Sequence, residues 1–140
     1  LKGDVRARCT EDRTAIETYM RQISGGIASA HGVNVSVDFQ TEFIETINST
    51  TPTQAVIRAG EKAGCDTIGD RDPMSFSEDF AHFCQEVPGC LLLLGNGLDG
   101  PHGRPLHSDT YDFNDALIPI GVEFWMHLVE DRLPANPLDR

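Results

Sequence analysis

The stretch Val33-Asn34-Val35-Ser36-Val37-Asp38-Phe39 alternates apolar and polar side chains without a break. In an extended chain, such alternation places the apolar side chains on one face and the polar ones on the other. The three valines are β-branched, which also favours extended backbone. The pattern therefore predicts a half-buried β-strand over 33–39, and this strand is the centre of the expected fold.

A long helix is expected immediately before this strand. Thr10 is a suitable N-cap, and the acidic Glu11 and Asp12 suit the positive end of a helix dipole. Gly32 is the type of residue that ends a helix. Five apolar residues recur between these limits at helical spacing and form one stripe. They are Ile16, Tyr19, Met20, Ile23 and Ile27.

A second strand is expected before the helix, over residues 3–9, where polarity also alternates. Residues 3–41 therefore read as a β-α-β unit. Two strands and one helix bury little apolar surface, so this unit should need further strands beside it. Unpaired strand edges recruit other chains. We therefore expect a homo-oligomer that associates through the strands near Val5 or Val35.

The second half of the chain is expected to form helices on either side of one strand. Thr51-Pro52-Thr53-Gln54 has the form of a capping box and predicts a helix to about Ala63. The run Cys90–Leu94 is apolar on both faces of a pleat, which is typical of an interior strand. A last helix is expected from about Asp115 to Glu130, with six apolar side chains facing the core: Leu117, Val122, Phe124, Trp125, Leu128 and Val129. The expected fold class is α/β, with one domain over 1–48 and another over 49–140.

A shorter helix is expected between these elements. It would begin at Ser77-Glu78-Asp79 and end at Pro88-Gly89. A helix start presents free backbone N–H groups, so Ser77 is a candidate contact for an anionic ligand as well as a plain N-cap. Arg6 could clamp a substrate carboxylate, although charged residues on a strand are more often solvated.

Charge and length limit the function. The chain has 140 residues, with 11 basic and 22 acidic side chains and a net charge of −11. This balance argues against nucleic acid and anionic membranes as partners, since both require clustered cations. The apolar run 90–94 is far shorter than the roughly 20 residues of a membrane span. Four cysteines without a Cys-x-x-Cys pair are expected to be reduced thiols of a cytoplasmic protein.

The long loop over 95–114 is a candidate location for chemistry, because ligands bind at the carboxyl ends of strands in open α/β sheets. It is rich in glycine and proline, and it carries four side chains that could bind a metal ion: His102, His107, Asp109 and Asp112. Their spacing is not diagnostic. The alternative is a set of ordinary surface-loop residues.

Several short motifs occur in a fixed order along the second half. They are Met74-Ser75-Phe76-Ser77-Glu78-Asp79-Phe80, Val87-Pro88-Gly89-Cys90, Leu94-Gly95-Asn96-Gly97, Leu106-His107-Ser108, Tyr111-Asp112-Phe113-Asn114-Asp115 and Pro119-Ile120-Gly121. This series resembles the C-terminal part of the M20 family of metallopeptidases and amidohydrolases, in the branch of hippurate hydrolase and the N-acyl-amino-acid amidohydrolases. Residues 3–39 are similar to the second half of that family's lid, or dimerisation, domain.

The resemblance implies a fragment of a zinc-peptidase-like enzyme that hydrolyses the amide bond of N-acyl amino acids such as hippurate. Such enzymes bind two divalent ions, zinc or alternatively manganese or cobalt. Of their metal ligands, only the late histidine is matched here, by His107; the general base is expected upstream, so no catalytic residue lies in this chain. Ser77, Glu78 and Arg6 are candidate substrate contacts.

The chain opens at Leu1 in what reads as a strand, which also predicts a piece of a longer polypeptide. The fragment alone is expected to be inactive and to bind no metal ion tightly. A non-catalytic dimerisation or binding module is the alternative function. A His-x-Asp or Cys-Gly-His-Asp motif and a Glu-Glu pair upstream of Leu1 would favour the enzyme.

Overall fold

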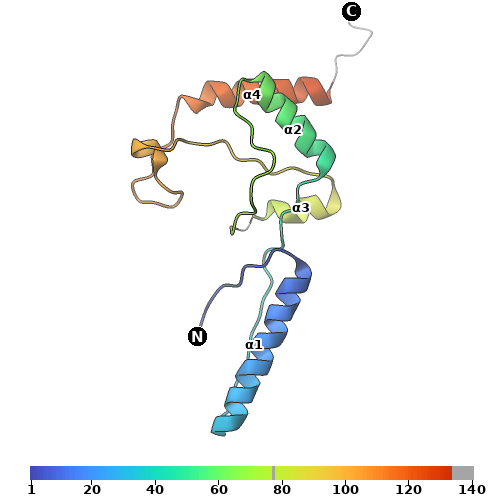
Figure 1. Ribbon diagram of the computed structural model, residues 1–140, viewed down its shortest axis with the longest axis vertical. Coiled ribbons are helices and arrows are strands. Elements are labelled where there is room, and N and C mark those ends of the chain that lie inside the picture. The colour runs from blue at the N-terminus through green and yellow to red at the C-terminus, as the bar shows by residue number, and fades with distance from the viewer. Residues whose placement is uncertain (77, 134–140) are drawn as a thin grey trace, which may run out of the picture. The chain divides into compact units, whose positions relative to one another are not determined.

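The computed structural model describes residues 1–76 and 78–133. In that part of the chain, the regular elements are α1 (Thr10–His31), α2 (Thr50–Lys62), α3 (Phe80–Glu86), the short 3₁₀ helix η1 (Gly100–Gly103) and α4 (Leu117–Arg132) (Figure 1). Two compact units contain them. The first unit comprises Leu1–Ile47 and the described residues of Asp72–Val87, and the second comprises Asn48–Arg71 and the described residues from Pro88 onward.

Helix α1 follows the expectation closely at its C-terminal end. Gly32 adopts the left-handed conformation, with φ 64°, and its N–H donates to the carbonyl groups of Ala28 and Ser29. At the other end, the N-cap is Cys9 rather than Thr10, because the N–H of Asp12 donates to Cys9 Sγ at 3.5 Å. The expected cap at Thr10 was therefore wrong by one residue.

The segment after α1 returns along the helix within the first unit. The Val33 N–H donates to the Ala28 carbonyl at 3.0 Å, and the Arg21 guanidinium donates to the Val37 carbonyl at 2.7 Å. Figure 1 shows this segment running beside α1. The Arg21 side chain thus supplies one hydrogen bond that a neighbouring strand would otherwise supply.

The three expected strands do not form in the described part of the chain. Residues 3–9, 33–39 and 90–94 lie outside regular structure, because none of them has a second strand to complete a hydrogen-bonded ladder. The alternation survives only as a difference in exposure: Val37 and Phe39 are half-buried, whereas Val33 and Val35 are exposed. The described residues are helical and compatible with an α/β fragment, and the α/β class itself stays a prediction.

The run 90–94 is held in the second unit by a side chain. The Leu91 N–H donates to Asn48 Oδ1, and Asn48 Nδ2 donates to the Leu91 carbonyl, both at 2.8 Å. The Ser49 N–H also donates to the Gly89 carbonyl at 2.8 Å. One amide side chain therefore satisfies both backbone groups of Leu91, as a strand neighbour would.

Helices α2 and α4 pack against each other and form the core of the second unit. Ala55, Ala59 and Gly60 are the buried residues of α2, and Phe124 is the buried residue of α4. The Arg58 guanidinium donates to both carboxylate oxygens of Asp131 at 3.2 and 2.8 Å. This pair links the two helices at their surface.

The start of α2 differs from the expected capping box. The helix begins at Thr50 after Ser49, and no side chain caps it, so Thr51 lies inside the first turn. The Thr53 hydroxyl instead donates to the Ser49 carbonyl at 2.9 Å. The expected stop is close to the observed one, since α2 ends at Lys62 and Gly64 has φ 72°.

Helices α3 and α4 lie near their expected positions. Helix α3 ends at Glu86, directly before the Pro88-Gly89 stop, while the expected start at Ser77 falls outside the described residues. Helix α4 begins two residues later than expected, and Pro119 lies in its first turn, where a missing N–H costs nothing. None of the described helices is both long enough and apolar enough to cross a membrane.

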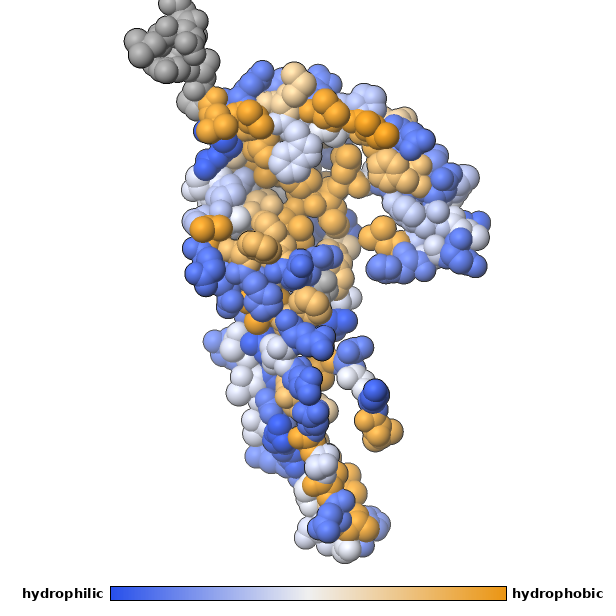
Figure 2. Space-filling view, turned by 180° about the vertical axis from the view of Figure 1, so that it is seen from behind, coloured by the Kyte–Doolittle hydropathy of each residue, from blue (hydrophilic) through white to orange (hydrophobic). Residues whose placement is uncertain are grey.

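The apolar residues of α4 face several directions. Phe124 is buried as expected, but Val122, Trp125 and Val129 are 54%, 58% and 53% exposed, so the expectation that these three face a core was wrong. The reason is that α4 is apolar around most of its circumference, and α2 covers only one face. Figure 2 shows the resulting apolar surface along this helix.

Candidate functional site

Asn96 forms the base of the loop that carries His107. Its side-chain Nδ2 donates to the carbonyl oxygens of His102 at 2.9 Å and Asp112 at 2.8 Å. His102 Nδ1 also lies 3.2 Å from the Asp112 carbonyl. Because a carbonyl only accepts hydrogen bonds, this contact requires the proton on Nδ1. The side chains of Asn96 and His102 therefore hold residues 102 and 112 close to each other.

Asn114 connects this loop to the helix that follows. Its N–H donates to Asn96 Oδ1 at 2.8 Å, and its Nδ2 donates to the Asn96 carbonyl at 3.3 Å. Asn114 Oδ1 accepts from the Ala116 N–H at 3.2 Å, and its carbonyl accepts from the Leu117 N–H at 2.9 Å. Asn114 thus joins Asn96 to the start of α4.

His107 occupies a turn in an uncommon backbone conformation. The Ser108 N–H donates to the Pro105 carbonyl at 3.1 Å, which makes 105–108 a β-turn with His107 as its third residue. The φ of His107 is 67°, and His107 is the one non-glycine residue with positive φ in the described chain. A type II turn requires positive φ at this position and usually has glycine or asparagine there. The left-handed conformation costs a histidine on the order of 1 kcal/mol.

A second turn follows directly. The Tyr111 N–H donates to the Ser108 carbonyl at 3.2 Å, and the Thr110 N–H donates to Ser108 Oγ at 3.3 Å. Hydroxyl-to-backbone bonds of this kind stabilise short turns. His107 itself is exposed, so its imidazole is presented to the surroundings by two consecutive turns.

The four candidate metal-binding side chains of the loop do not form one site here. Within residues 1–76 and 78–133, no three or more His, Cys, Asp or Glu side chains are grouped so that they could hold a metal ion. The ring of His102 is directed instead at the Asp112 carbonyl. The role of His107 as a metal ligand stays a prediction.

The other predicted site residues belong to the first unit. Arg6 is exposed in the segment before α1, and Glu78 is exposed just before α3. Ser77 lies outside the described residues. His107 belongs to the second unit, and the substrate contacts of Arg6 and Glu78 stay predictions.

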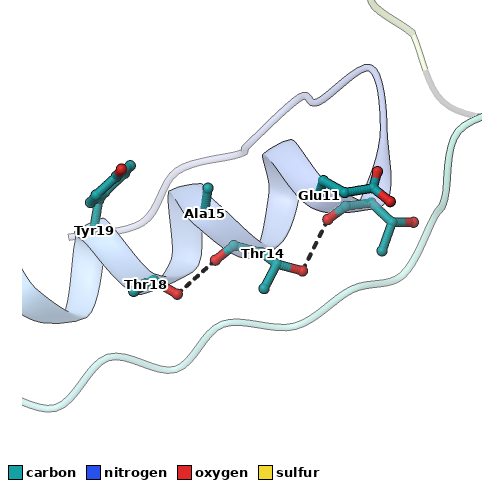
Figure 3. Close-up of a pocket in the computed structure, with 6 residues that line it drawn as sticks. Glu11, Thr14, Ala15, Thr18 and Tyr19 are labelled. Atoms are coloured by element: carbon teal, nitrogen blue, oxygen red, sulfur yellow. Dashed lines mark hydrogen bonds between the residues drawn. The ribbon is translucent and has the colours of Figure 1, made fainter.

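A pocket of about 490 Å³ lies along one face of α1 (Figure 3). The hydroxyls of Thr14 and Thr18 each donate to the carbonyl four residues earlier, at 2.9 Å. These hydroxyls are thus already used by the helix backbone, and the pocket offers few free polar groups to a ligand. It is lined by Thr10, Glu11, Thr14, Ala15, Thr18 and Tyr19.

A smaller pocket of about 150 Å³ in the first unit contains Glu45. The Glu45 carboxylate accepts from the Thr10 N–H at 3.0 Å, from the Thr10 hydroxyl at 2.9 Å and from Arg13 at 3.1 Å. A hydrogen bond from its own backbone N–H, then those from Thr10 and Arg13, hold the pKa of Glu45 below its ordinary value. This cluster fixes residue 45 to the start of α1 and leaves no carboxylate oxygen unpaired.

Comparison with known proteins yields a consistent set of relatives. An IAA-amino acid hydrolase of Arabidopsis thaliana is 29% identical over 129 residues, covering 87% of this chain and 29% of its own length. The hippurate hydrolase of Campylobacter jejuni is 28% identical over 134 residues, covering 91% of this chain and 33% of its own. An N-acetylcysteine deacetylase of Bacillus subtilis is 28% identical over 130 residues, covering 91% and 32%. The chain is similar to amidohydrolases of the M20 kind.

This relationship confirms the resemblance expected from the sequence motifs. The chain spans about a third of the length of these curated amidohydrolases, which is consistent with a C-terminal fragment. No protein-family model matches the chain. No solved structure matches it either.

Proposed function

We propose that the chain is the C-terminal part of a metal-dependent amidohydrolase that cleaves the amide bond of N-acyl amino acids. The observation that carries this proposal is the match, over about nine-tenths of the chain, to hydrolases named for hippurate, for IAA-amino acids and for N-acetylcysteine. All three names describe an acyl group joined to an amino acid. A hippurate-like substrate is the specific form of the proposal.

His107 is the proposed metal ligand of this chain. A neutral imidazole is a common zinc ligand, and the exposed His107 ring is compatible with that role. A bound zinc, manganese or cobalt ion would supply polarisation of the amide carbonyl and a water of lowered pKa. The other ligands of the two ions and the general base would come from the part of the relatives that this chain does not match.

The remaining predicted contacts have specific proposed tasks. Arg6 would attract the carboxylate of the amino-acid half of the substrate, and Ser77 with Glu78 would bind and orient it. In this proposal, residues 1–48 belong to a lid domain and 49–140 to a cytoplasmic α/β catalytic domain. The 140-residue chain alone would then be inactive and would bind no metal ion tightly.

The proposal is tested with two polypeptides, the 140-residue chain and the complete product of its gene. Each is assayed for release of free amino acid from hippurate, N-acetylcysteine and an indole-3-acetyl amino acid. We expect turnover only by the complete product, lost with a chelator and restored by zinc, manganese or cobalt. Turnover that persists in chelator, or turnover by the short chain, contradicts the proposal.

A second candidate function, a non-catalytic module that forms a homo-oligomer, is favoured by one observation. In the first unit, α1 and the segment after it expose five large apolar side chains: Tyr19, Ile23, Ile27, Val33 and Val35, which are between 51% and 62% exposed. Burial of each valine or isoleucine contributes about 1.5–3 kcal/mol, so this surface favours association. Large apolar patches of this kind mark interaction sites.

Sedimentation velocity over a range of protein concentrations tests this candidate. We expect a concentration-dependent oligomer that Val35→Lys weakens. Val122→Lys is the matched control, because Val122 is equally exposed but lies on α4 in the second unit. A monomer at every concentration, or an equal effect of both variants, contradicts association through the first unit.

A further inference from the structure

One amide group, that of Asn96, bridges the two ends of the loop that carries His107. Asn96 Nδ2 spans the carbonyl oxygens of His102 and Asp112, at 2.9 and 2.8 Å. His107 lies midway between these two residues, five positions from each. The two hydrogen bonds therefore fix both ends of the segment whose centre is His107.

Apolar packing contributes little to the conformation of this segment. Leu106 is 68% exposed, and His107 itself is exposed. The turn places a histidine where glycine or asparagine is usual, so the local backbone preference of His107 opposes the observed conformation. Hydrogen bonds must then hold the segment. Those from Asn96 join its two ends, together with the bond from His102 Nδ1 to the Asp112 carbonyl.

Asn96 is itself held in place. Its Oδ1 accepts from the Asn114 N–H at 2.8 Å, which fixes the side chain so that Nδ2 points at the two carbonyls. An asparagine provides both an acceptor and two donors, and all three are used here. Aspartate has the same shape but has no N–H to donate, so it keeps the first bond and loses the other two.

We propose that Asn96 is the positioning residue for His107, and that it acts by closing the loop and thereby holding His107 in its left-handed conformation. The idea that this positioning presents a metal ligand rests on the proposed function. The geometric claim does not rest on it, because it concerns the backbone of His107 in the chain alone.

The test uses Asn96→Asp in the 140-residue chain and follows His107 by NMR. A residue with positive φ shows a strong nuclear Overhauser effect between its own amide proton and its Hα, because the two protons are unusually close. We expect this signal in the wild type and its loss in Asn96→Asp. The side-chain signals of Phe124 and Trp125, which lie in T-shaped contact on α4, should be unchanged.

Asn48→Asp is the matched control. Asn48 also donates to a backbone carbonyl and accepts from a backbone N–H, but it does so at Leu91, outside the loop. We expect the His107 signal to persist in this variant.

Two results would overturn the proposal. One is an unchanged His107 signal in Asn96→Asp, since the loop closure would then be unnecessary. The other is simultaneous loss of the His107, Phe124 and Trp125 signals, since Asn96 would then stabilise the whole unit. Absence of hydrolysis by the complete gene product would remove the proposed function but would leave the positioning of His107 as measured.

Discussion

Asn96 and Asn114 are joined by two hydrogen bonds that connect the main chain of each residue to the side chain of the other. The Asn114 N–H donates to Asn96 Oδ1 at 2.8 Å, and Asn114 Nδ2 donates to the Asn96 carbonyl at 3.3 Å. The two residues enclose the loop with His107 and join the end of the apolar run to the start of α4. The pair of Asn96 and Asn114 therefore holds both ends of the loop.

Replacement of His107 by glycine should stabilise the second unit. Glycine adopts positive φ without a steric penalty, so we expect the free energy of unfolding to rise by up to about 1 kcal/mol. Urea denaturation followed by Trp125 fluorescence measures it. Leu106→Gly is the control: Leu106 is exposed and has no positive φ, so this change should destabilise. A destabilising His107→Gly variant would contradict the turn assignment.

Two glycines should respond oppositely to alanine. Gly26 lies in α1 with open space around its Cβ position, so Gly26→Ala should stabilise the first unit by about 0.5–1 kcal/mol. At Gly60, a Cβ would lie 2.5 Å from Thr67 Cγ2, and the residue is buried. Gly60→Ala should therefore destabilise the second unit by about 1–3 kcal/mol. Thermal unfolding monitored by circular dichroism measures both.

Thr67→Ser separates this clash from other effects at Gly60. Serine lacks Cγ2, so the double variant Gly60→Ala, Thr67→Ser should recover most of the stability that Gly60→Ala loses. If the two changes are instead additive, the contact between helix α2 and residue 67 is not the cause.

Acid should weaken the cluster at the start of α1. The pKa of Glu45 is lowered in the folded chain, so its contribution to stability is complete above the ordinary value of 4.5 and is lost as the pH falls through the folded value. Glu45→Gln should cost roughly 0.5–1 kcal/mol at pH 7 and less at pH 3. Urea denaturation at both pH values measures this. Glu42→Gln is the control, and an equal cost at both pH values would be inconsistent with the assignment.

The ion pair between α2 and α4 should be sensitive to salt. Hydrogen bonds with Arg58 hold the pKa of Asp131 below its ordinary value, and those with Asp131 raise the pKa of Arg58. Half of the Arg58 side chain is exposed, so we expect only a small loss of stability in Asp131→Asn. Unfolding in low salt and in about 1 M salt should show the loss only in low salt. A loss that is independent of salt would point to packing instead.

The helices could be predicted from the sequence because their signals are local. The spacing of apolar residues from Ile16 to Ile27 predicted a helix and Gly32 predicted its stop, and both the helix and the stop were confirmed. The strands could not be predicted in the same way. The alternation at 33–39 shows which side chains would share one face of a strand, but it does not show whether a neighbouring strand is present. In the structure, Arg21 supplies a hydrogen bond to Val37 that a strand would have supplied.

The candidate site, like the fold, could be predicted from the sequence only in part. The motifs that contain Asn96, His107 and Asn114 were visible, and the relationship to amidohydrolases confirms what they indicated. Neither asparagine had a predicted role, because the bonds between them join residues 18 positions apart and an asparagine beside glycine indicates only a loop. The turn at His107 was also missed, since histidine is not the residue that signals positive φ.

The central claim is that this chain supplies His107 as a metal ligand to an amidohydrolase of N-acyl amino acids. The most direct test is chelator-sensitive hydrolysis of hippurate by the complete gene product, compared between wild type and His107→Asn. Asparagine favours the same left-handed turn but lacks the imidazole, so the loop is preserved while the ligand is removed. We predict metal-dependent turnover in the wild type and its loss by at least about tenfold in the variant. Equal turnover by both proteins would contradict the account.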